Sequence, residues 1–426
     1  MTTRRLLILT YHFPPSAASG SFRMLGFAKH LPSHGWKTVV VAPPMIPWEP
    51  ADPGLMGQLS AATAVHHVPY LKNRVARRLA PIAGWLPRAA RACASAIREH
   101  RPDAVLTSGP PQQIHWLGLW LKCRYGLAWF ADFRDPWYPA GRFDRGRDLA
   151  SWRVGLQEKA VIRAADLVIA NAPAARQTLA ETYPRHRAKF VTLPNGYDRE
   201  VFAALTADRP LRRAGAPLRV VHAGAIYVGR DPRPFLDAVK IVNESIRLDA
   251  QFFGPPPETG IDLTREVETR GLNDRVTVAG QIPYARALRE MVGADVLLLM
   301  DSPGRTVGVP AKLYEYIGAG RPVLALGARG GDLEQVLAES GVSHRIAPPG
   351  DPSAIAAALS ELIRESFSTS GSGPRRNPDR FSRESITAHL ASLLNGCVSR
   401  ETGQGGATLA DRDREPVAAA AGGLST

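Results

Sequence analysis

Short apolar runs alternate with segments of helical spacing along most of this chain. Leu6–Thr10 is the first apolar run, and a loop rich in Pro, Ser and Gly follows it. In Ser21–His34 apolar residues recur three or four positions apart, and Thr38–Ala42 is apolar again. Strand, glycine-containing loop, helix and strand in this order are typical of the opening of a doubly wound α/β domain.

The alternation pauses near the middle of the chain and then restarts, which predicts two such domains. We assign residues 1–204 to the first domain, the polar, Arg-rich residues 205–217 to a linker and residues 218–366 to the second domain. Further strands are predicted at Ala104–Thr107, Leu127–Phe133, Leu167–Asn171, Phe190–Leu193, Leu218–Ala223, Ala250–Gly254, Arg275–Ala279, Asp295–Met300 and Val323–Leu326. Later helices are predicted at Leu263–Arg270, Ala285–Val292, Asp351–Arg364 and Phe381–Leu394.

The end of the chain has a different composition. Residues 367–380 contain Ser, Gly and Pro and are predicted to be a flexible linker. Residues 381–397 are predicted to form the last helix, and residues 398–426, rich in Gly and Ala, a disordered tail.

Length and composition indicate a globular cytoplasmic protein. The chain has 426 residues, enough for two domains with full cores, and no apolar run long enough for a transmembrane helix. Its opening resembles a signal peptide but lacks a small-residue cleavage site, so a first strand is favoured. The three cysteines are widely spaced, as expected in a reducing compartment without a disulfide framework.

A net charge of +14 predicts attraction to an anionic partner. Nucleic acid, an acidic membrane leaflet and a phosphorylated substrate all fit, and charge alone does not choose between them. Residues 72–101 carry many Arg and Lys residues, one acid (Glu99) and interleaved apolar side chains, with Pro81 and Pro87 as interruptions. Short amphipathic helices lying on the inner face of an anionic membrane are one interpretation, and ordinary surface helices are the other.

The stretch Arg305–Leu326, RTVGVPAKLYEYIGAGRPVLAL, carries the clearest local signal. Pro310 suits a first helical position, Gly318 and Gly320 can end the helix, and Val323–Leu326 has the apolar pattern of a buried parallel strand. We therefore predict a loop, a short helix, a sharp stop and a core strand.

Lys312 and Glu315 share one face of this predicted helix. A helix N-terminus with a lysine beside it attracts anions, and a carboxylate one turn further on can accept hydrogen bonds from a ribose diol. Diphosphate and ribose side by side describe a sugar nucleotide. The alternative is a solvated surface ion pair.

Other candidate residues follow predicted strands. Arg134 and Asp135 come directly after Leu127–Phe133, where α/β folds bind ligands, although they could form a structural ion pair. Arg230, with Arg233 as its alternative, could bind phosphate through its planar guanidinium. The backbone at Gly20 could approach a phosphate or simply cap a helix. His115 is a weaker candidate.

The motif PAKLYEY followed by GAGRPVLAL resembles the nucleotide-binding signature of retaining glycosyltransferases with the GT-B fold, in the glycogen-synthase-like superfamily (glycosyltransferase family 4-like). This resemblance implies two doubly wound Rossmann-like α/β domains facing across a cleft, with the last helix packed back on the first domain. It places Glu315 on the donor ribose. A second glutamate, which contacts the donor sugar in that superfamily, is replaced here by Val307.

The resemblance also implies the remaining donor contacts. Gly20 would face the diphosphate across the cleft. DFRDPW resembles a variant of the family motif, and in the best register Arg134 aligns with the histidine that is usual there. The residues implied to bind the donor are Gly20, Gly224, Arg230, Gln281, Ile282, Thr306, Gly308, Lys312, Leu313 and Glu315. Arg134, Asp135, Arg230 and Lys312 are the predicted catalytic residues.

The predicted reaction is transfer of a sugar from a nucleoside diphosphate-sugar to a hydroxyl of a glycan, lipid-linked or surface-polysaccharide precursor, with retention. No metal cofactor is expected, because the only Asp-x-Asp, Asp411–Asp413, lies in the predicted tail. A sugar-nucleotide 2-epimerase of the same fold is one alternative, although its acidic and histidine catalytic residues cannot be placed. The other is a non-catalytic basic scaffold, but no aromatic-interleaved nucleic-acid module is present, so no nucleic-acid partner is expected.

Overall fold

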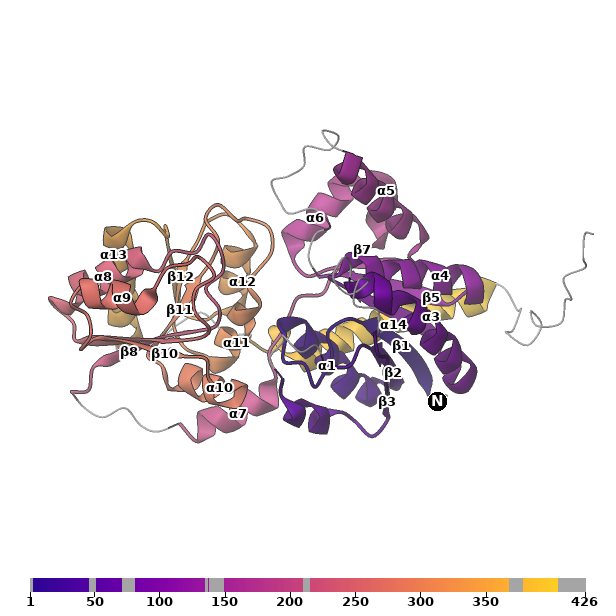
Figure 1. Ribbon diagram of the computed structural model, residues 1–426, viewed down its shortest axis with the longest axis horizontal. Helices are drawn as coiled ribbons and strands as arrows, with labels where there is room; N and C mark the ends of the chain where they lie inside the picture. Colours follow the sequence, from indigo (N-terminus) through magenta and orange to yellow (C-terminus); the bar gives the residue numbers. More distant parts are fainter. Residues whose placement is uncertain are drawn as a thin grey trace, which may run out of the picture.

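The computed structural model describes residues 3–45, 51–70, 81–134, 137, 149–209, 215–367 and 378–404, which form two α/β domains (Figure 1). The first sheet has the order β3-β2-β1-β4-β5-β6-β7 and the second β10-β9-β8-β11-β12-β13, with all described pairs parallel. The strands are β1 Arg4–Thr10, β2 Trp36–Ala42, β3 Thr63–His67, β4 Ala104–Gly109, β5 Ala128–Phe133, β6 Leu167–Ala170, β7 Phe190–Thr192, β8 Leu218–Ala223, β9 Leu248–Phe253, β10 Val276–Gly280, β11 Val296–Met300, β12 Val323–Leu326 and β13 His344–Ala347. The predicted fold class is confirmed.

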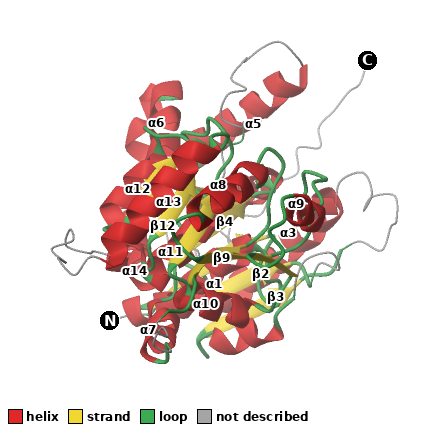
Figure 2. Cartoon of the chain, turned by 90° about the vertical axis from the view of Figure 1, so that its left-hand side faces the viewer, coloured by secondary structure: helices red, strands yellow, loops and turns green. Residues whose placement is uncertain are grey.

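Helices enclose the sheets (Figure 2). They are α1 Ser19–His30, α3 Pro81–His100, α4 His115–Tyr125, α5 Leu149–Ala164, α6 Pro173–Thr182, α7 Arg199–Ala207, α8 Arg233–Asn243, α9 Leu263–Thr269, α10 Tyr284–Gly293, α11 Ala311–Ala319, α12 Asp332–Ser340, α13 Pro352–Phe367 and α14 Arg383–Gln404. Alternate residues of β1 enter different cores, with Leu7 on one face and Leu6 on the other, because side chains of a strand alternate between faces. No helix in the described ranges combines the length and apolarity needed to cross a membrane.

The edge strands β3 and β13 were not predicted. Thr63–His67 is only partly buried, and His344–Ala347 begins with two polar residues, so neither shows the continuous apolar run of a central parallel strand. Edge strands are buried less completely, and this removes the hydrophobic signal on which the prediction depends.

The segment around Pro87 forms one helix, not the predicted short helices. α3 runs unbroken from Pro81 to His100 with Pro87 inside it. Proline removes one backbone hydrogen bond, but burial of the apolar face compensates. Trp85 is fully buried and its indole donates a hydrogen bond to the Val68 carbonyl at 2.9 Å. The apolar side of the described part therefore faces the core, while residues 71–80 lie outside the described ranges.

The chain crosses between the domains twice, and the two crossings are hydrogen-bonded to each other. Tyr197 N–H donates to the Phe381 carbonyl at 3.1 Å, and Arg383 N–H donates to the Tyr197 carbonyl at 2.8 Å. Phe202, in α7, already belongs to a core of the second domain, so the expected boundary at residue 204 falls inside this helix. α14 lies against α1 (Figure 1) and continues past residue 397. Most of the expected linker and tail, residues 368–377 and 405–426, lies outside the described ranges.

α11 is the helix predicted within Arg305–Leu326. It begins one residue later than predicted, and only one of the two glycines ends it. Pro310 is its N-cap residue, so the helix starts at Ala311, and Gly320 ends it with a left-handed φ of 63°. Gly318 lies inside the helix. A Cβ there would come within 2.6 Å of the Tyr197 ring and 2.7 Å of the Phe202 ring. This glycine allows close packing of α11 on α7.

We predict that Gly318→Ala destabilises the second domain by about 1–3 kcal/mol, because overpacking outweighs the helix propensity of about 1 kcal/mol that alanine adds. Gly155→Ala is the control, since Gly155 is helical and has open space around its Cβ position. All tryptophans stand at or before position 152. Tryptophan fluorescence therefore follows the first domain during urea unfolding, and circular dichroism follows both. Equal stability of Gly318→Ala and the parent would contradict the packing explanation.

Candidate functional site

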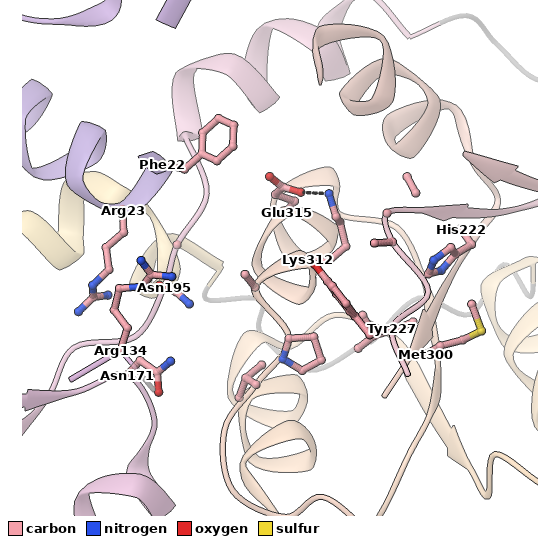
Figure 3. A pocket seen from close by; sticks show the side chains of 18 of the residues that line it. Phe22, Arg23, Arg134, Asn171, Asn195, His222, Tyr227, Met300, Lys312 and Glu315 are labelled. Carbon is pink, nitrogen blue, oxygen red and sulfur yellow. Dashed lines mark ion pairs between the residues drawn. The ribbon is translucent and has the colours of Figure 1, made fainter. Parts of the chain in front are cut away.

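A cavity of about 450 Å³ lies between the two domains. Figure 3 shows side chains of both domains pointing into it. Its lining contains six cations and one acid. These charged residues are Arg23, Arg134, Arg230, Arg305, Lys312, Arg383 and Glu315. A cavity with this charge balance favours an anionic ligand.

The wall formed by the second domain contains the predicted Lys312–Glu315 pair at the start of α11. Lys312 Nζ lies 2.7 Å from Glu315 Oε2, and the Tyr284 hydroxyl donates to Glu315 Oε1 at 2.9 Å. The Glu315 side chain is 10 % exposed. Its Oε2 is buried and accepts no hydrogen bond of good geometry, so it keeps capacity for a hydroxyl donor from a ligand.

Arg230 approaches the same wall from the loop after β8. Its guanidinium lies over the Tyr227 ring at 5.0 Å and 3.9 Å from the buried carboxylate of Asp301, which also pairs with Arg305 at 2.6 Å. Burial lowers the pKa of Arg230, and Asp301 opposes this effect. Arg230 remains charged, because its ordinary pKa is far above neutrality. Gly224, at the end of β8, also lines the cavity, whereas Arg233 pairs with Asp231 on the surface.

His222 is a cavity residue that the sequence reasoning missed. Burial lowers its pKa to about 4, so the imidazole is neutral near pH 7. Nδ1 lies 2.9 Å from the Leu298 carbonyl, while Nε2 is buried without a hydrogen bond of good geometry. His222 and Gly224 also line an adjoining hollow of about 390 Å³. In the sequence, only the position of His222 near the carboxyl end of a strand could have indicated that it lines a binding cavity.

The wall formed by the first domain carries Arg134, and Asn171 and Asn195 lie beside it in Figure 3. Gly20 does not line the cavity but touches Arg134: a Cβ at Gly20 would lie 2.2 Å from Arg134 Nη1. The absence of a side chain at Gly20 therefore leaves the space that the Arg134 guanidinium occupies. Asp135, the other predicted catalytic residue in this region, lies outside the described ranges.

Arg23 holds the first-domain wall in position through a buried ion pair. It donates two hydrogen bonds to Asp132, at 2.9 and 3.0 Å, and further ones to the carbonyls of Leu193 and Pro194. Ser108 donates to the same carboxylate at 2.9 Å. One guanidinium thus joins α1, β5 and the first crossing segment.

Aromatic side chains of the two domains meet in the lining of the cavity. The rings of Phe22 and Tyr284 stack with centroids 4.5 Å apart, and the Arg383 guanidinium lies over Phe22 at 5.5 Å. Burial raises the pKa of Tyr284, and the charge of Glu315 raises it further. Tyr284 therefore stays protonated and donates to Glu315.

Several predicted site residues lie outside the cavity lining. Leu313 is fully buried in the second core, and Ile282 packs against that core next to Gln281. Thr306 lines a separate hollow between α6 and α12. His115 is buried between aromatic rings, and burial lowers its pKa to about 3, as for a core histidine. None of these residues lines the cavity.

The loop around Gly308 is attached to the first domain. Asp332, 1 % exposed at the start of α12, accepts hydrogen bonds from the Gly308 N–H at 2.7 Å and the Ala174 N–H at 2.8 Å. Ala174 lies in the first turn of α6, whose N-terminus favours a negative charge. Val307 packs beside these bonds against alanines of the first domain, among them Ala175. The loop predicted to lie near the phosphates therefore bridges the domains.

We expect Asp332→Asn to weaken domain closure, because an amide can accept at only one end and its NH₂ group would face an N–H. Each buried donor that loses its acceptor costs about 1–3 kcal/mol. The matched control is Glu334→Gln, which removes a charge from the same turn but affects only the local Gly330 contact. Small-angle scattering should show a larger radius of gyration for Asp332→Asn alone. The same radius in both variants would contradict this role.

Comparison with known proteins agrees with the architecture. Residues 21–196 match the family described as "Glycosyl transferase 4-like domain", and residues 217–365 match "Glycosyl transferases group 1". "Probable glycosyltransferase WbjE" of Pseudomonas aeruginosa is 30% identical over 117 residues, which are 26% of this chain and 29% of that protein. The match thus spans less than a third of that relative.

Solved structures share the fold at low identity. HepE of Anabaena, in complex with UDP and glucose, has a TM-score of 0.63 and 18% identity, with 92% of this chain and 100% of that chain covered. A UDP-N-acetylglucosamine 2-epimerase has a TM-score of 0.56 and 14% identity, with 93% and 98% covered. The fold alone does not separate these activities. The first domain of this chain matches the glycosyl transferase 4-like family and the second matches glycosyl transferases group 1, and together the two domains adopt the GT-B fold.

Proposed function

We propose that this protein transfers a sugar from a nucleoside diphosphate-sugar to an acceptor hydroxyl, with retention of configuration and without a metal. The observation that carries the proposal is the convergence of Lys312, Glu315 and Arg230 on one cavity between two domains of glycosyltransferase families. UDP is the first nucleotide to test, since HepE is described in complex with UDP.

The donor would lie along the wall formed by the second domain. Its diphosphate would contact the N-terminus of α11, Lys312 and Arg230, which attract negative charge by dipole and by formal charge. The ribose would donate a hydrogen bond to Glu315 Oε2, the buried acceptor. The base would extend into the adjoining hollow lined by Gly254 and Val278.

In the reaction, the bond between the anomeric carbon and the diphosphate oxygen breaks, and a bond from that carbon to the acceptor oxygen forms on the same face. The acceptor proton passes to the departing diphosphate. Arg230 and Lys312 would stabilise the charge on this leaving group, which is the role that pre-positioned cations play in a cavity shielded from water. Arg134, on the opposite wall, would contact the acceptor or the transferred sugar.

We predict that UDP raises the melting temperature of the parent protein and that Glu315→Ala loses most of this shift. A lost hydrogen bond to a charged group costs about 1.5–3 kcal/mol, or roughly 10- to 100-fold in affinity. Glu361→Ala is the control, because Glu361 is an exposed residue that pairs with Arg345 away from the cavity. Melting curves across UDP, GDP, ADP and dTDP concentrations measure the effect.

Two results would overturn the proposal. Nucleotide shifts that are unchanged in Glu315→Ala would remove the ribose role. Conversion of a bound UDP-sugar into its epimer without any acceptor would favour the 2-epimerase alternative.

The acceptor is proposed to be a glycan, lipid-linked or surface-polysaccharide precursor. Contact of residues 72–101 with an anionic membrane remains part of this proposal, and it now depends on charge, because Trp85 and Ile97 are buried. The exposed Arg91 and Arg98 are the available cations on α3.

We expect the double change Arg91→Gln and Arg98→Gln to weaken co-sedimentation with phosphatidylserine vesicles, by roughly 30-fold if each arginine contributes about 1 kcal/mol. Arg185→Gln with Arg187→Gln removes the same charge from another exposed part of the first domain and is the control. Equal binding by both double variants would exclude a specific membrane surface on α3.

A further inference from the structure

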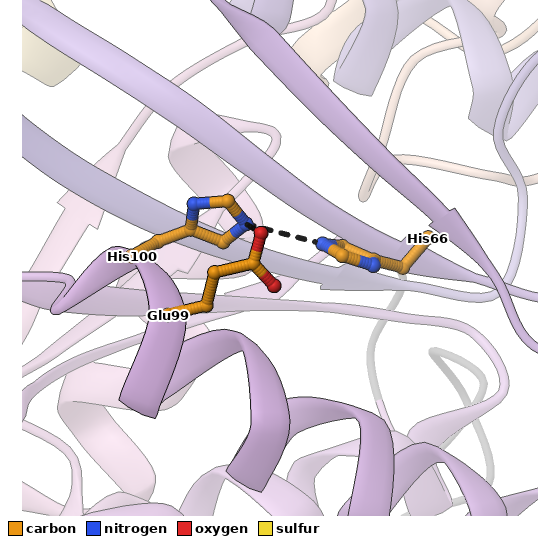
Figure 4. A group of neighbouring side chains, drawn as sticks. All are labelled: His66, Glu99 and His100. Atoms are coloured by element: carbon orange, nitrogen blue, oxygen red, sulfur yellow. Dashed lines mark hydrogen bonds and ion pairs between the residues drawn. The ribbon is translucent and has the colours of Figure 1, made fainter.

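Three potential metal ligands meet at the edge of the first sheet, away from the cavity. His66 belongs to β3, the edge strand, and Glu99 and His100 are the neighbouring C-terminal residues of α3 (Figure 4). Figure 4 shows the Nε2 atoms of the two imidazoles facing each other, with the Glu99 carboxylate beside them. One ligand atom from each residue lies within 4.8 Å of the other two. The site is independent of the proposed transferase activity, because none of the three lines the cavity.

Two of the distances between ligand atoms match the edges of a small coordination tetrahedron. The two Nε2 atoms are 3.3 Å apart, and His100 Nε2 lies 3.5 Å from Glu99 Oε1. With zinc–ligand bonds of about 2.0–2.2 Å, ligand atoms in a tetrahedral site lie about 3.3–3.6 Å from each other. A single ion could therefore contact all three groups with small side-chain adjustments.

A direct imidazole–imidazole hydrogen bond explains the geometry less well. It would join only two of the three groups, and 3.3 Å is longer than the preferred N–H donor distance of about 2.9–3.0 Å. A metal, in contrast, uses a lone pair of each ring and a carboxylate oxygen at once.

We propose that His66, Glu99 and His100 bind a divalent transition-metal ion, with zinc as the reference. Two imidazoles and one carboxylate are a common zinc ligand set, and water would take the fourth position. Imidazole nitrogens favour zinc, copper and nickel over magnesium and calcium. His100 is the last residue of α3, where the helix dipole presents its negative end to a cation. Both histidines are partly buried and Glu99 is exposed, so an ion can enter from solvent.

Such an ion would join an edge strand to the end of a helix that is close to it only in the folded protein. Binding to the native state alone raises stability by mass action. The ion would thus stabilise the open edge of the first sheet, where β3 has a strand partner on one side only among the described strands.

The test uses the full chain without an affinity tag, stripped with EDTA and dialysed into metal-free buffer. We expect isothermal titration with ZnCl₂ to give one site, Zn²⁺ to raise the melting temperature and MgCl₂ to leave it unchanged. His66→Gln and His100→Gln should each weaken Zn²⁺ binding at least ten-fold. Glu99→Gln should weaken it less, because the two imidazoles remain.

The matched control is His67→Gln. His67 is exposed on the same strand, and its ring lies against the Pro43 carbonyl instead of the cluster. Cobalt gives a second readout, since its visible absorption is strong in four-coordinate sites and weak in six-coordinate ones. Absence of a Zn²⁺-specific shift, or equal Zn²⁺ affinity in His66→Gln and His67→Gln, would overturn the proposal.

Discussion

The buried ion pair between Arg23 and Asp132 is the interaction on which the geometry of the cleft depends. Neither side chain could be buried alone, because an unpaired charge in the interior is far more costly than a pair with its hydrogen bonds satisfied. The other bonds of Arg23 go to backbone carbonyls where the chain leaves the first sheet. The pair therefore fixes the start of α1, the end of β5 and the direction of the crossing segment together.

Charge pairing also explains how a cavity with so many cations stays assembled before a ligand arrives. Glu315 lies against Lys312, and Asp301 lies near both Arg230 and Arg305. These pairs lower mutual repulsion, and under the proposed function a diphosphate would take over part of each contact, because the cations remain at the cavity wall. Arg230, Arg305 and Lys312 belong to the second domain, so half of the cations that line the cavity are paired within one wall.

The sequence predicted what contiguous residues encode and missed what tertiary contacts bring together. Lys312 and Glu315 were found because one helix presents them three residues apart. Asp332 was missed, because its partners at Gly308 and Ala174 are separated from it by 24 and 158 positions. The cluster of His66, Glu99 and His100 was missed for the same reason, and β3 itself lacks the pattern of a central strand. At Pro87 the sequence predicted an interruption that the structure does not have, because packing of α3 outweighs the effect of a local helix breaker.

The replacement of an expected glutamate by Val307 has a structural consequence that joins these observations. A valine cannot hydrogen-bond a sugar, and here it packs against alanines of the opposite domain while Asp332 holds the adjacent N–H. The Val307 side chain therefore contributes to domain contact. Polar groups able to orient a sugar line both walls, at Asn171 and Asn195 beside Arg134 and at Tyr227 and Arg305 in the second domain. Under the proposed function, selectivity for the sugar would thus depend on both domains, including the one that receives the acceptor.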